Sequence, residues 1–475
     1  MKSKWLLGFI GTVGILISMT AGAWFGYHQV KTTSILEEKK NVNTKEMDKI
    51  EQVFEIVSDR YVEKINKTKL AEGAIKGILG QLDDPYSVYM NAKLAAQFEE
   101  SLDSSFQGIG AEISESDGKI IIMSPFKDSP AEKAGLLSND RIVSIDGKDT
   151  TGWTVSDVVD KIRGPKGSSL KLGILRAGTD HPVEISVKRD EIPINTILSK
   201  MKKVDDKNIG RILITQFSEK TAPDFEKALN KLEKQKLNGL IIDVRDNPGG
   251  LLSSVGDILG DFIPKSTPYI QIQDRNNKKE KFYTKLKSKK PYPIVILQNR
   301  GSASAAEILS AAMSEAGGYK IIGENSFGKG TVQQAISLGD GSEVKMTFFK
   351  WLTPNGTWIH KKGVVPDLVV HQPDYFSIHS IKLENNLLKN QNSDSIKVMQ
   401  QMLVANGFAP GRTDGYFDDQ TELSVKAFQR SEDLKVSGIV NQDLINLMQK
   451  NISVMVDDER NDLQMKAAME WISAN

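Results

Sequence analysis

Gly301-Ser-Ala-Ser304-Ala-Ala-Glu-Ile308 is the stretch at which the sequence pattern changes from a strand to a helix. The apolar run from Pro293 to Leu297 before it is typical of a buried strand, and after Ser304 apolar residues recur at helical spacing. Ser304 is therefore predicted near a helix N-terminus, where free N–H groups and the helix dipole favour negative charge. A serine nucleophile that needs an oxyanion hole would be well placed there.

A serine nucleophile also needs a base, and histidine is scarce in this chain. None of the five histidines lies in the segments around Ser304. Lysine can serve when burial lowers its pKa, and Lys329 in Phe327-Gly-Lys-Gly-Thr-Val-Gln333 is the candidate. Gln333 could hold the lysine or a substrate amide. On these residues alone, Ser304 could equally be a helix cap and Lys329 a solvated turn residue.

A phosphate-binding loop is the sharpest competing interpretation, because Gly323 to Lys329 matches the first part of such a motif. Gly330 stands where the motif requires Ser or Thr. The following residues also alternate like strands, whereas a P-loop must open a helix. We reject this interpretation.

Composition sets broad limits on the class of protein. The length of 475 residues suits about three domains, and the net charge of +1 gives no reason to expect nucleic-acid binding. The chain has no cysteine, so disulfides and thiolate metal sites are excluded. We expect no cofactor and no metal ion.

The N-terminus predicts export. Lys2 and Lys4 precede an uncharged stretch at 5–27 that is long enough to cross a bilayer. We expect a membrane anchor with the rest of the chain outside the cytoplasm. The alternative is a cleaved signal peptide, since Ala21-Gly-Ala23 fits a cleavage site.

Three regions follow the N-terminus: a helical region at 47–105, short strands and turns at 106–190, and an α/β region at 191–376. The second resembles a PDZ domain, through Ser129-Pro-Ala-Glu-Lys-Ala-Gly-Leu136 and Asn139-Asp-Arg-Ile-Val-Ser-Ile-Asp-Gly147. The resemblance implies that the backbone amides of Gly108, Ile109 and Gly110 receive the terminal carboxylate of a peptide, which adds a strand to the sheet.

In the α/β region, a predicted strand at 239–244 ends in Arg245-Asp-Asn-Pro-Gly-Gly250. A glycine pair at the end of a strand lets backbone N–H groups approach a ligand closely, although it can also be an ordinary turn.

This motif, followed by Gly301–Ile308 and Phe327–Gln333 behind a PDZ domain, resembles the C-terminal processing peptidases, which are serine endopeptidases with a Ser–Lys dyad. The resemblance implies that Ser304 is the nucleophile, Lys329 the general base and Gln333 the residue that orients it. It further implies an oxyanion hole from the amides of Ala305 and of Gly249 or Gly250. Arg163 matches the arginine that links the PDZ domain to the active site.

The last part of the chain is distinct again. Residues 393–450 resemble the small helical peptidoglycan-binding domain of cell-wall enzymes, although a copy used only for packing or dimerisation would show the same pattern. Residues 451–475 are predicted to form a closing amphipathic helix.

The expected architecture is therefore multidomain α+β and α/β: a membrane helix, a helical region, a PDZ β-domain, an α/β protease core and a small all-α domain. The expected function is extracytoplasmic cleavage of proteins recognised by their C-termini, in envelope protein processing, regulatory proteolysis or signal transduction. Expected partners are protein substrates, the membrane, peptidoglycan and a second copy of the chain. The alternative is a catalytically silent, wall-bound PDZ scaffold.

Overall fold

The computed structural model describes residues 45–116, 118–176, 179 and 181–475, and these form two compact units. The first unit contains the described residues up to Phe98 and Val332–Phe349, and the second contains Glu99–Thr331 and Lys350–Asn475. The anchor or signal expected at 5–27 lies outside the described residues. Within the described ranges, no helix is both long and apolar enough to cross a membrane.

The first unit combines helices with a small antiparallel sheet. Asn66 caps one helix by accepting a hydrogen bond from Lys69 N at 3.1 Å. The helical spacing predicted between 47 and 102 is confirmed, and so are the strands predicted after Gly330. The elements are α2 (Lys45–Arg60), α3 (Lys67–Gly80), β1 (Val88–Met90), the start of α4 (Ala92–Leu102), β17 (Thr331–Ser337) and most of β18 (Glu343–Leu352). Both β1 and β17 pair with β18.

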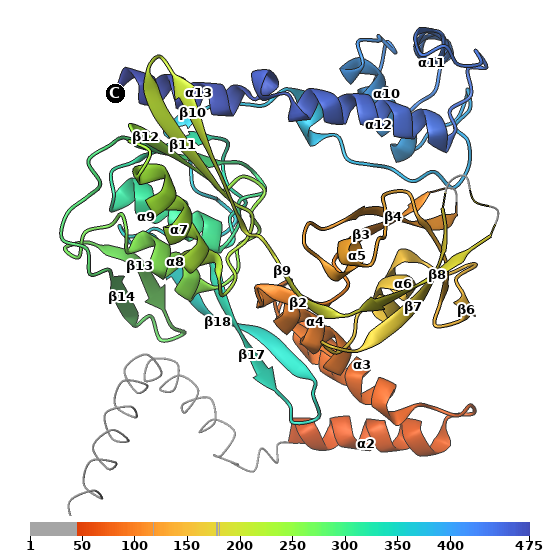
Figure 1. Ribbon diagram of the computed structural model, residues 1–475. Coiled ribbons are helices and arrows are strands. Elements are labelled where there is room, and N and C mark those ends of the chain that lie inside the picture. Colours follow the sequence, from red (N-terminus) through yellow and green to blue (C-terminus); the bar gives the residue numbers. More distant parts are fainter. Residues whose placement is uncertain (1–44, 117, 177–178, 180) are drawn as a thin grey trace, which may run out of the picture. The chain divides into compact units, whose positions relative to one another are not determined.

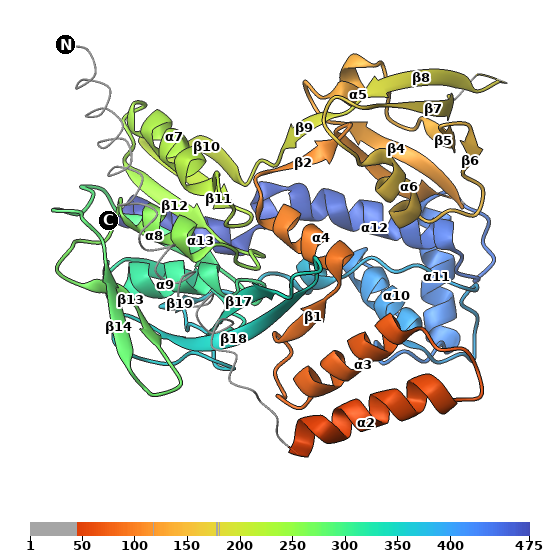
Figure 2. The same cartoon turned by 90° about the horizontal axis from the view of Figure 1, so that it is seen from below.

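The second unit begins with the predicted β-domain (Figure 2). Its sheet has the order β3-β4-β5-β7-β8, with β6 paired to β5, and buried Ile122, Leu136 and Leu170 form part of its core. The elements are β3 (Ala111–Ser116), β4 (Lys119–Pro125), α5 (Pro130–Lys133), β5 (Arg141–Ile145), β6 (Lys148–Asp149), α6 (Val155–Ile162), β7 (Ser169–Leu175) and β8 (Val183–Lys188). Strand β2 (Ser105–Gly108) pairs with β9 (Asp190–Pro193).

A six-stranded sheet forms the core of the α/β region, in the order β10-β11-β12-β15-β16-β19. Only the β10–β11 pair is antiparallel. The strands are β10 (Ile197–Val204), β11 (Lys207–Ile214), β12 (Gly239–Asp243), β15 (Ile294–Gln298), β16 (Lys320–Gly323) and β19 (Leu368–Val369). Since neighbouring parallel strands end at the same edge, the segments after β12, β15 and β16 meet there. These segments are the three motifs that the sequence singled out.

Helices cover both faces of this sheet (Figure 1). On one side lie α7 (Thr221–Glu233), α8 (Leu252–Leu259) and α9 (Ala305–Glu315). The other face is packed against α13 (Leu463–Ala474), whose Met465, Ala468 and Ile472 share a core with Ile241 and Val295. Helix α13 is thus part of the α/β core. A hairpin of β13 (Pro268–Gln273) and β14 (Lys279–Tyr283) pairs with the end of β18.

The helical region at 374–461, which separates the last strand of the sheet from α13 in the sequence, has its own core. This core includes buried Phe417, Phe428 and Met448. Its helices start at side-chain caps, such as the Ser393 hydroxyl, which accepts a hydrogen bond from Ile396 N. The elements are η1 (Asp374–Ser377), α10 (Asp394–Ala405), α11 (Asp419–Ser431), α12 (Gln442–Asp457) and η2 (Glu459–Asn461). The predicted boundary at 450 falls inside α12.

Candidate active site

Ser304 lies in a strained turn between β15 and α9. Its backbone dihedrals are φ 52° and ψ −112°, a region that residues other than glycine rarely adopt. Such a conformation costs about 1–3 kcal/mol and is typical of functional sites. The side chain is half-buried at the first turn of α9. The structure therefore places Ser304 at the strand–helix junction that the sequence predicted.

A buried carboxylate, which the sequence interpretation missed, connects this turn to the lysine segment. Glu307 is fully buried, and its Oε2 accepts hydrogen bonds from Ser304 N and from Lys329 N, both at 2.8 Å. Its Oε1 accepts from Ser326 Oγ at 2.5 Å and from Gly328 N at 2.6 Å. Because one oxygen receives both N–H groups, the nitrogens of Ser304 and Lys329 can be separated by no more than twice 2.8 Å.

A signal for Glu307 was present in the sequence. Serine followed three residues later by glutamate is the signature of a capping box, in which the glutamate accepts the N–H of the cap residue. The contact from Ser304 N to Glu307 is of this kind. The signature does not predict the other donors to the Glu307 carboxylate, which lie 19 to 22 residues downstream.

The backbone of the Lys329 segment is fixed on both sides. Trp351 Nε1 donates to the carbonyl of Lys329 at 2.8 Å, and Trp358 Nε1 donates to the carbonyl of Gly330 at 2.8 Å. Lys329 itself is half-buried. The backbone from which its side chain extends is therefore rigidly placed beside the Ser304 turn.

The Gly249–Gly250 turn after β12 also reaches Ser304. A Cβ on Gly249 would lie 2.9 Å from Ser304 Cβ, and one on Gly250 would lie 2.0 Å from the carbonyl oxygen of Phe217. Both glycines have positive φ, 107° and 137°. Only glycine fits this approach to the serine.

One predicted oxyanion donor is already engaged. The N–H of Gly249 donates to Asn247 Oδ1 at 2.8 Å, so in this conformation it does not point to a substrate oxygen. To serve as an oxyanion donor the Gly249 amide would have to release this bond, and its role stays a prediction. The amides of Gly250 and Ala305 stay the predicted donors.

Ser302, the other serine of the motif, has a structural role. Its side chain is fully buried, donates to the carbonyl of Val244 at 2.8 Å and accepts a hydrogen bond from Asn299 N at 3.0 Å. The hydroxyl therefore ties the loop after β15 to the end of β12. This engagement leaves Ser304 as the candidate nucleophile.

Gln333 lies in β17 and in the first unit, whereas Lys329 belongs to the second. Its Nε2 donates to Thr347 Oγ1 at 3.2 Å. The orienting role of Gln333 stays a prediction.

In the segment expected to bind a peptide, Gly108 ends β2, Ile109 and Gly110 follow it, and all three are buried. The carbonyl of Ile109 accepts from Ala131 N and that of Gly110 from Phe126 N. Their peptide-binding role stays a prediction.

Arg163 ends α6 and contacts Glu100 through a hydrogen bond, with its guanidinium 5.5 Å from the Phe106 ring centre. These contacts join α6 to α4 and to β2. The proposed coupling of Arg163 to the active site stays a prediction.

One histidine comes near the lysine segment through folding. A Cβ on Gly330 would lie 2.8 Å from His360 N, and the His360 ring stacks on Trp358 with centres 5.2 Å apart. Thirty residues separate Gly330 and His360 in the chain, so their proximity was not visible in the sequence.

Four family models match the chain. Peptidase family S41 matches residues 208–370, and a PDZ domain matches 121–176. The N-terminal domain of the activating protease CtpB matches 9–94, and a peptidoglycan binding domain matches 392–448. The PDZ domain implies binding of peptides or protein C-termini, and the last domain suggests binding to the cell wall.

Two curated proteins are similar to this chain over most of its length. The chain is 50% identical over 431 residues to the carboxy-terminal processing protease CtpB of Bacillus subtilis (strain 168), which covers 91% of this chain and 90% of the relative. It is 39% identical to CtpA of the same organism, over 99% of both chains. Among solved structures, the photosystem II D1 C-terminal processing protease has 27% identity and a TM-score of 0.42, covering 69% of this chain and 94% of that one. On its identity to CtpB and CtpA, the chain belongs to the carboxy-terminal processing proteases of peptidase family S41 and is a serine peptidase.

Proposed function

We propose that this serine peptidase is a membrane-anchored, extracytoplasmic endopeptidase that cleaves with a Ser304–Lys329 dyad. The observation that carries the proposal is the pair of hydrogen bonds from Ser304 N and Lys329 N to one oxygen of Glu307. The strained backbone of Ser304 supports the same assignment, since strain is retained where it serves a function.

In the proposed mechanism, Ser304 Oγ attacks the carbonyl carbon of the scissile peptide while Lys329 Nζ accepts the hydroxyl proton. The amides of Ala305 and Gly250 stabilise the negative charge that develops on the carbonyl oxygen. The tetrahedral intermediate collapses, Lys329 returns the proton to the leaving amine, and an acyl-enzyme forms. Water then attacks the ester, with Lys329 as base, and releases the second product.

The mechanism places a demand on Lys329, which must be neutral to accept a proton. An exposed lysine has a pKa of about 10.4, so activity near pH 7 requires a fall of roughly three units. Desolvation by bound substrate is the physical means of lowering it.

The substrate is proposed to be a protein with an exposed C-terminus that the PDZ domain captures by strand addition. Cleavage would serve envelope protein processing or regulatory proteolysis. The peptidoglycan-binding domain and the N-terminal anchor would keep the enzyme between membrane and wall, and the family resemblance favours a homodimer.

The test is cleavage of an unstructured peptide with a free C-terminus by Ser304→Ala and Lys329→Ala variants. Both are expected to lose turnover by at least about a thousandfold, as in other hydrolases that lose a member of the catalytic unit. Ser393→Ala is a matched control, because Ser393 is also a helix-capping serine but lies in the helical domain. Undiminished cleavage by Ser304→Ala would refute the dyad.

The silent-scaffold alternative predicts no turnover by the unmodified chain. A histidine base predicts that His360→Phe, which retains the stacking surface on Trp358, abolishes turnover. For the Ser–Lys dyad we expect His360→Phe to remain active.

A further inference from the structure

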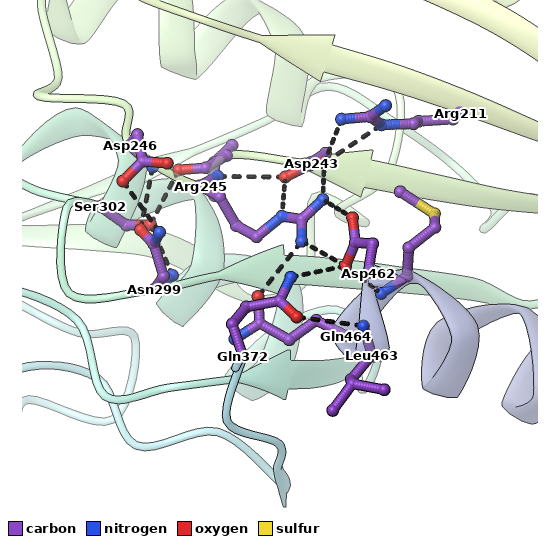
Figure 3. A network of polar contacts seen from close by, with 12 residues as sticks. Arg211, Asp243, Arg245, Asp246, Asn299, Ser302, Gln372, Asp462, Leu463 and Gln464 are labelled. Carbon is purple, nitrogen blue, oxygen red and sulfur yellow. Dashed lines mark hydrogen bonds and ion pairs between the residues drawn. The ribbon is translucent and has the colours of Figure 1, made fainter. Parts of the chain in front are cut away.

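Arg245, four residues before Gly249 in the chain, lies in a buried cluster of charges that the proposed mechanism does not use (Figure 3). Arg245 lies between Asp243 and Asp462, with side-chain exposures of 11%, 0% and 16%. Its guanidinium donates twice to Asp243, at 2.9 and 2.8 Å, and twice to Asp462, at 2.8 and 2.9 Å. Bidentate contacts of this kind fix the position of an arginine and also balance its charge.

Asp462 lies 217 residues after Arg245 in the chain. It caps α13 by accepting from Met465 N at 2.9 Å, and it also accepts from Gln372 Nε2 at 2.6 Å. Gln372 Oε1 in turn accepts from Leu463 N at 3.0 Å. The start of α13 is therefore held by side chains of the protease core, in addition to the apolar packing further along the helix.

The charges in the cluster balance. Arg211 also donates to Asp243, at 2.7 and 3.1 Å, so two arginines face two carboxylates. Removal of the Asp462 charge would leave both arginines on one buried aspartate. Burial alone would lower the pKa of Arg245, but the two carboxylates outweigh it and raise the pKa above its usual range. Burial alone would raise the pKa of Asp462, yet the hydrogen bond and charge of Arg245 lower it.

The residues next to Arg245 are connected to the Ser304 loop. Asp246 N donates to Asn299 Oδ1 and Asn299 Nδ2 donates back to Asp246 Oδ1, both at 2.9 Å. One residue further, the carbonyl of Asn247 accepts from Ala303 N at 2.9 Å. The segment that follows Arg245 and leads to Gly250 is thus hydrogen-bonded to the loop that carries Ser304.

We propose that Arg245 and Asp462 are positioning residues for the proposed active site, and that α13 is a required part of the peptidase. Asp462 holds Arg245, and Arg245 holds the turn that carries the Gly250 amide against the turn of Ser304. This inference rests on the proposed function, since it concerns the geometry of that site. It adds that α13, a helix of twelve residues beyond the proposed wall-binding domain, supports catalysis.

The experiment compares kcat and KM of full-length Asp462→Asn with those of the unmodified chain, on an internally quenched peptide with a free C-terminus. Asparagine has nearly the same shape but lacks the charge. We expect kcat to fall about 10- to 100-fold, because a shift of about 1 Å in a catalytic group has an effect of this size, while KM changes less than about threefold. A structural role alone would reduce the folded fraction and leave kcat per folded molecule unchanged.

Glu459→Gln is the matched control. Glu459 lies three residues before Asp462 and pairs with Lys200 and Lys202 at 45% side-chain exposure, with no contact to Arg245 among the described interactions. Its kcat should stay within about twofold, because exposed ion pairs contribute little. An equal loss of kcat in both variants would overturn the assignment to Asp462.

Gln372→Ala provides a milder change if Asp462→Asn does not fold. It removes one donor to Asp462 and the acceptor of Leu463 N, so we expect a smaller fall in kcat of about three- to tenfold. An unchanged kcat in a folded Asp462→Asn, or in Gln372→Ala where Asp462→Asn is unfolded, overturns the proposal. Retained turnover in Ser304→Ala instead refutes the proposed function, so the two failures are distinguishable.

Discussion

Replacement of Glu307 by glutamine is the most direct test of how the site is built. The carboxylate accepts four hydrogen bonds, two at each oxygen, and no part of it reaches solvent. Glutamine has nearly the same shape but only one acceptor oxygen. Its NH₂ group cannot accept the backbone N–H groups that point at it.

The expected loss of folding stability follows from the hydrogen-bond donors that lose their acceptor in the variant. In the better orientation the amide oxygen serves Ser304 N and Lys329 N, while the NH₂ group donates to Ser326 Oγ and leaves Gly328 N–H without an acceptor. One orphaned buried donor costs about 1–3 kcal/mol, and two bonds that change from charged to neutral lose about 1 kcal/mol each. Glu307→Gln should therefore destabilise the chain by about 3–5 kcal/mol.

Turnover should fall as well, because the same oxygen sets the spacing of the Ser304 and Lys329 backbones. We expect a fall in kcat of about a hundredfold, with KM changed much less. Urea unfolding measures the free energy, and cleavage of a quenched peptide below the unfolding transition measures kcat. Glu315→Gln is the control, since Glu315 is exposed on the same helix and accepts one hydrogen bond, from Asn355 N. A loss below 1 kcal/mol together with a kcat within twofold of the unmodified chain would refute the reasoning.

Three further predictions concern the same region. Gly249→Ala should abolish turnover and lower the free energy of unfolding, measured with urea, by at least about 1 kcal/mol. The reason is that its Cβ would lie 2.9 Å from Ser304 Cβ at a backbone φ of 107°. Full activity of this variant would contradict the close approach. Ser302→Ala should lower the free energy of unfolding by about 1–3 kcal/mol, because the N–H of Asn299 and the carbonyl of Val244 lose a buried partner. An unaltered unfolding midpoint would contradict this. The pKa of Asp462 is lowered in the folded chain, so its charge stabilises the fold above the unfolded pKa of about 3.9 and this contribution is lost as pH falls through the folded value. The stability gap between the unmodified chain and Asp462→Asn should be constant from pH 5 to 8 and narrow below about pH 4, and a gap that persists at pH 2 would oppose this.

The sequence supported the Ser304 turn well, because a strand followed at once by a helix is a local pattern with a local cause. Strands were also predicted before the Arg245 and Gly301 motifs, and parallel neighbours end at one edge of a sheet. The strand before the Phe327 motif, β16, was not predicted. Glu307 was missed for a different reason. Its cap contact with Ser304 is local, but its contact with Lys329 N depends on how β16 follows β15 in the sheet.

The engaged amide of Gly249 could not be predicted either. Both glycines of the pair fit an oxyanion donor by type, and the hydrogen bond of the Gly249 amide depends on a side chain two residues earlier, that of Asn247. His360 is a second example. Its distance in the sequence excluded it as a neighbour of the proposed site, yet in the structure it lies against Gly330.

The position of α13 has a consequence for how the chain reaches its active form. The apolar residues Ile241 and Val295 of the protease sheet are buried against Met465, Ala468 and Ile472, and each such side chain contributes about 1.5–3 kcal/mol when it is removed from water, alanine less. Until α13 is synthesised, that face of the sheet is exposed and Arg245 lacks one of its two carboxylates. The PDZ and sheet segments precede α13 by about a hundred residues or more, so a chain that ends after the domain at 392–448 has every proposed reacting group and an incomplete core. Both the folding of the core and, on the present proposal, the geometry of the Gly250 and Ser304 turns therefore depend on the last helix of the chain.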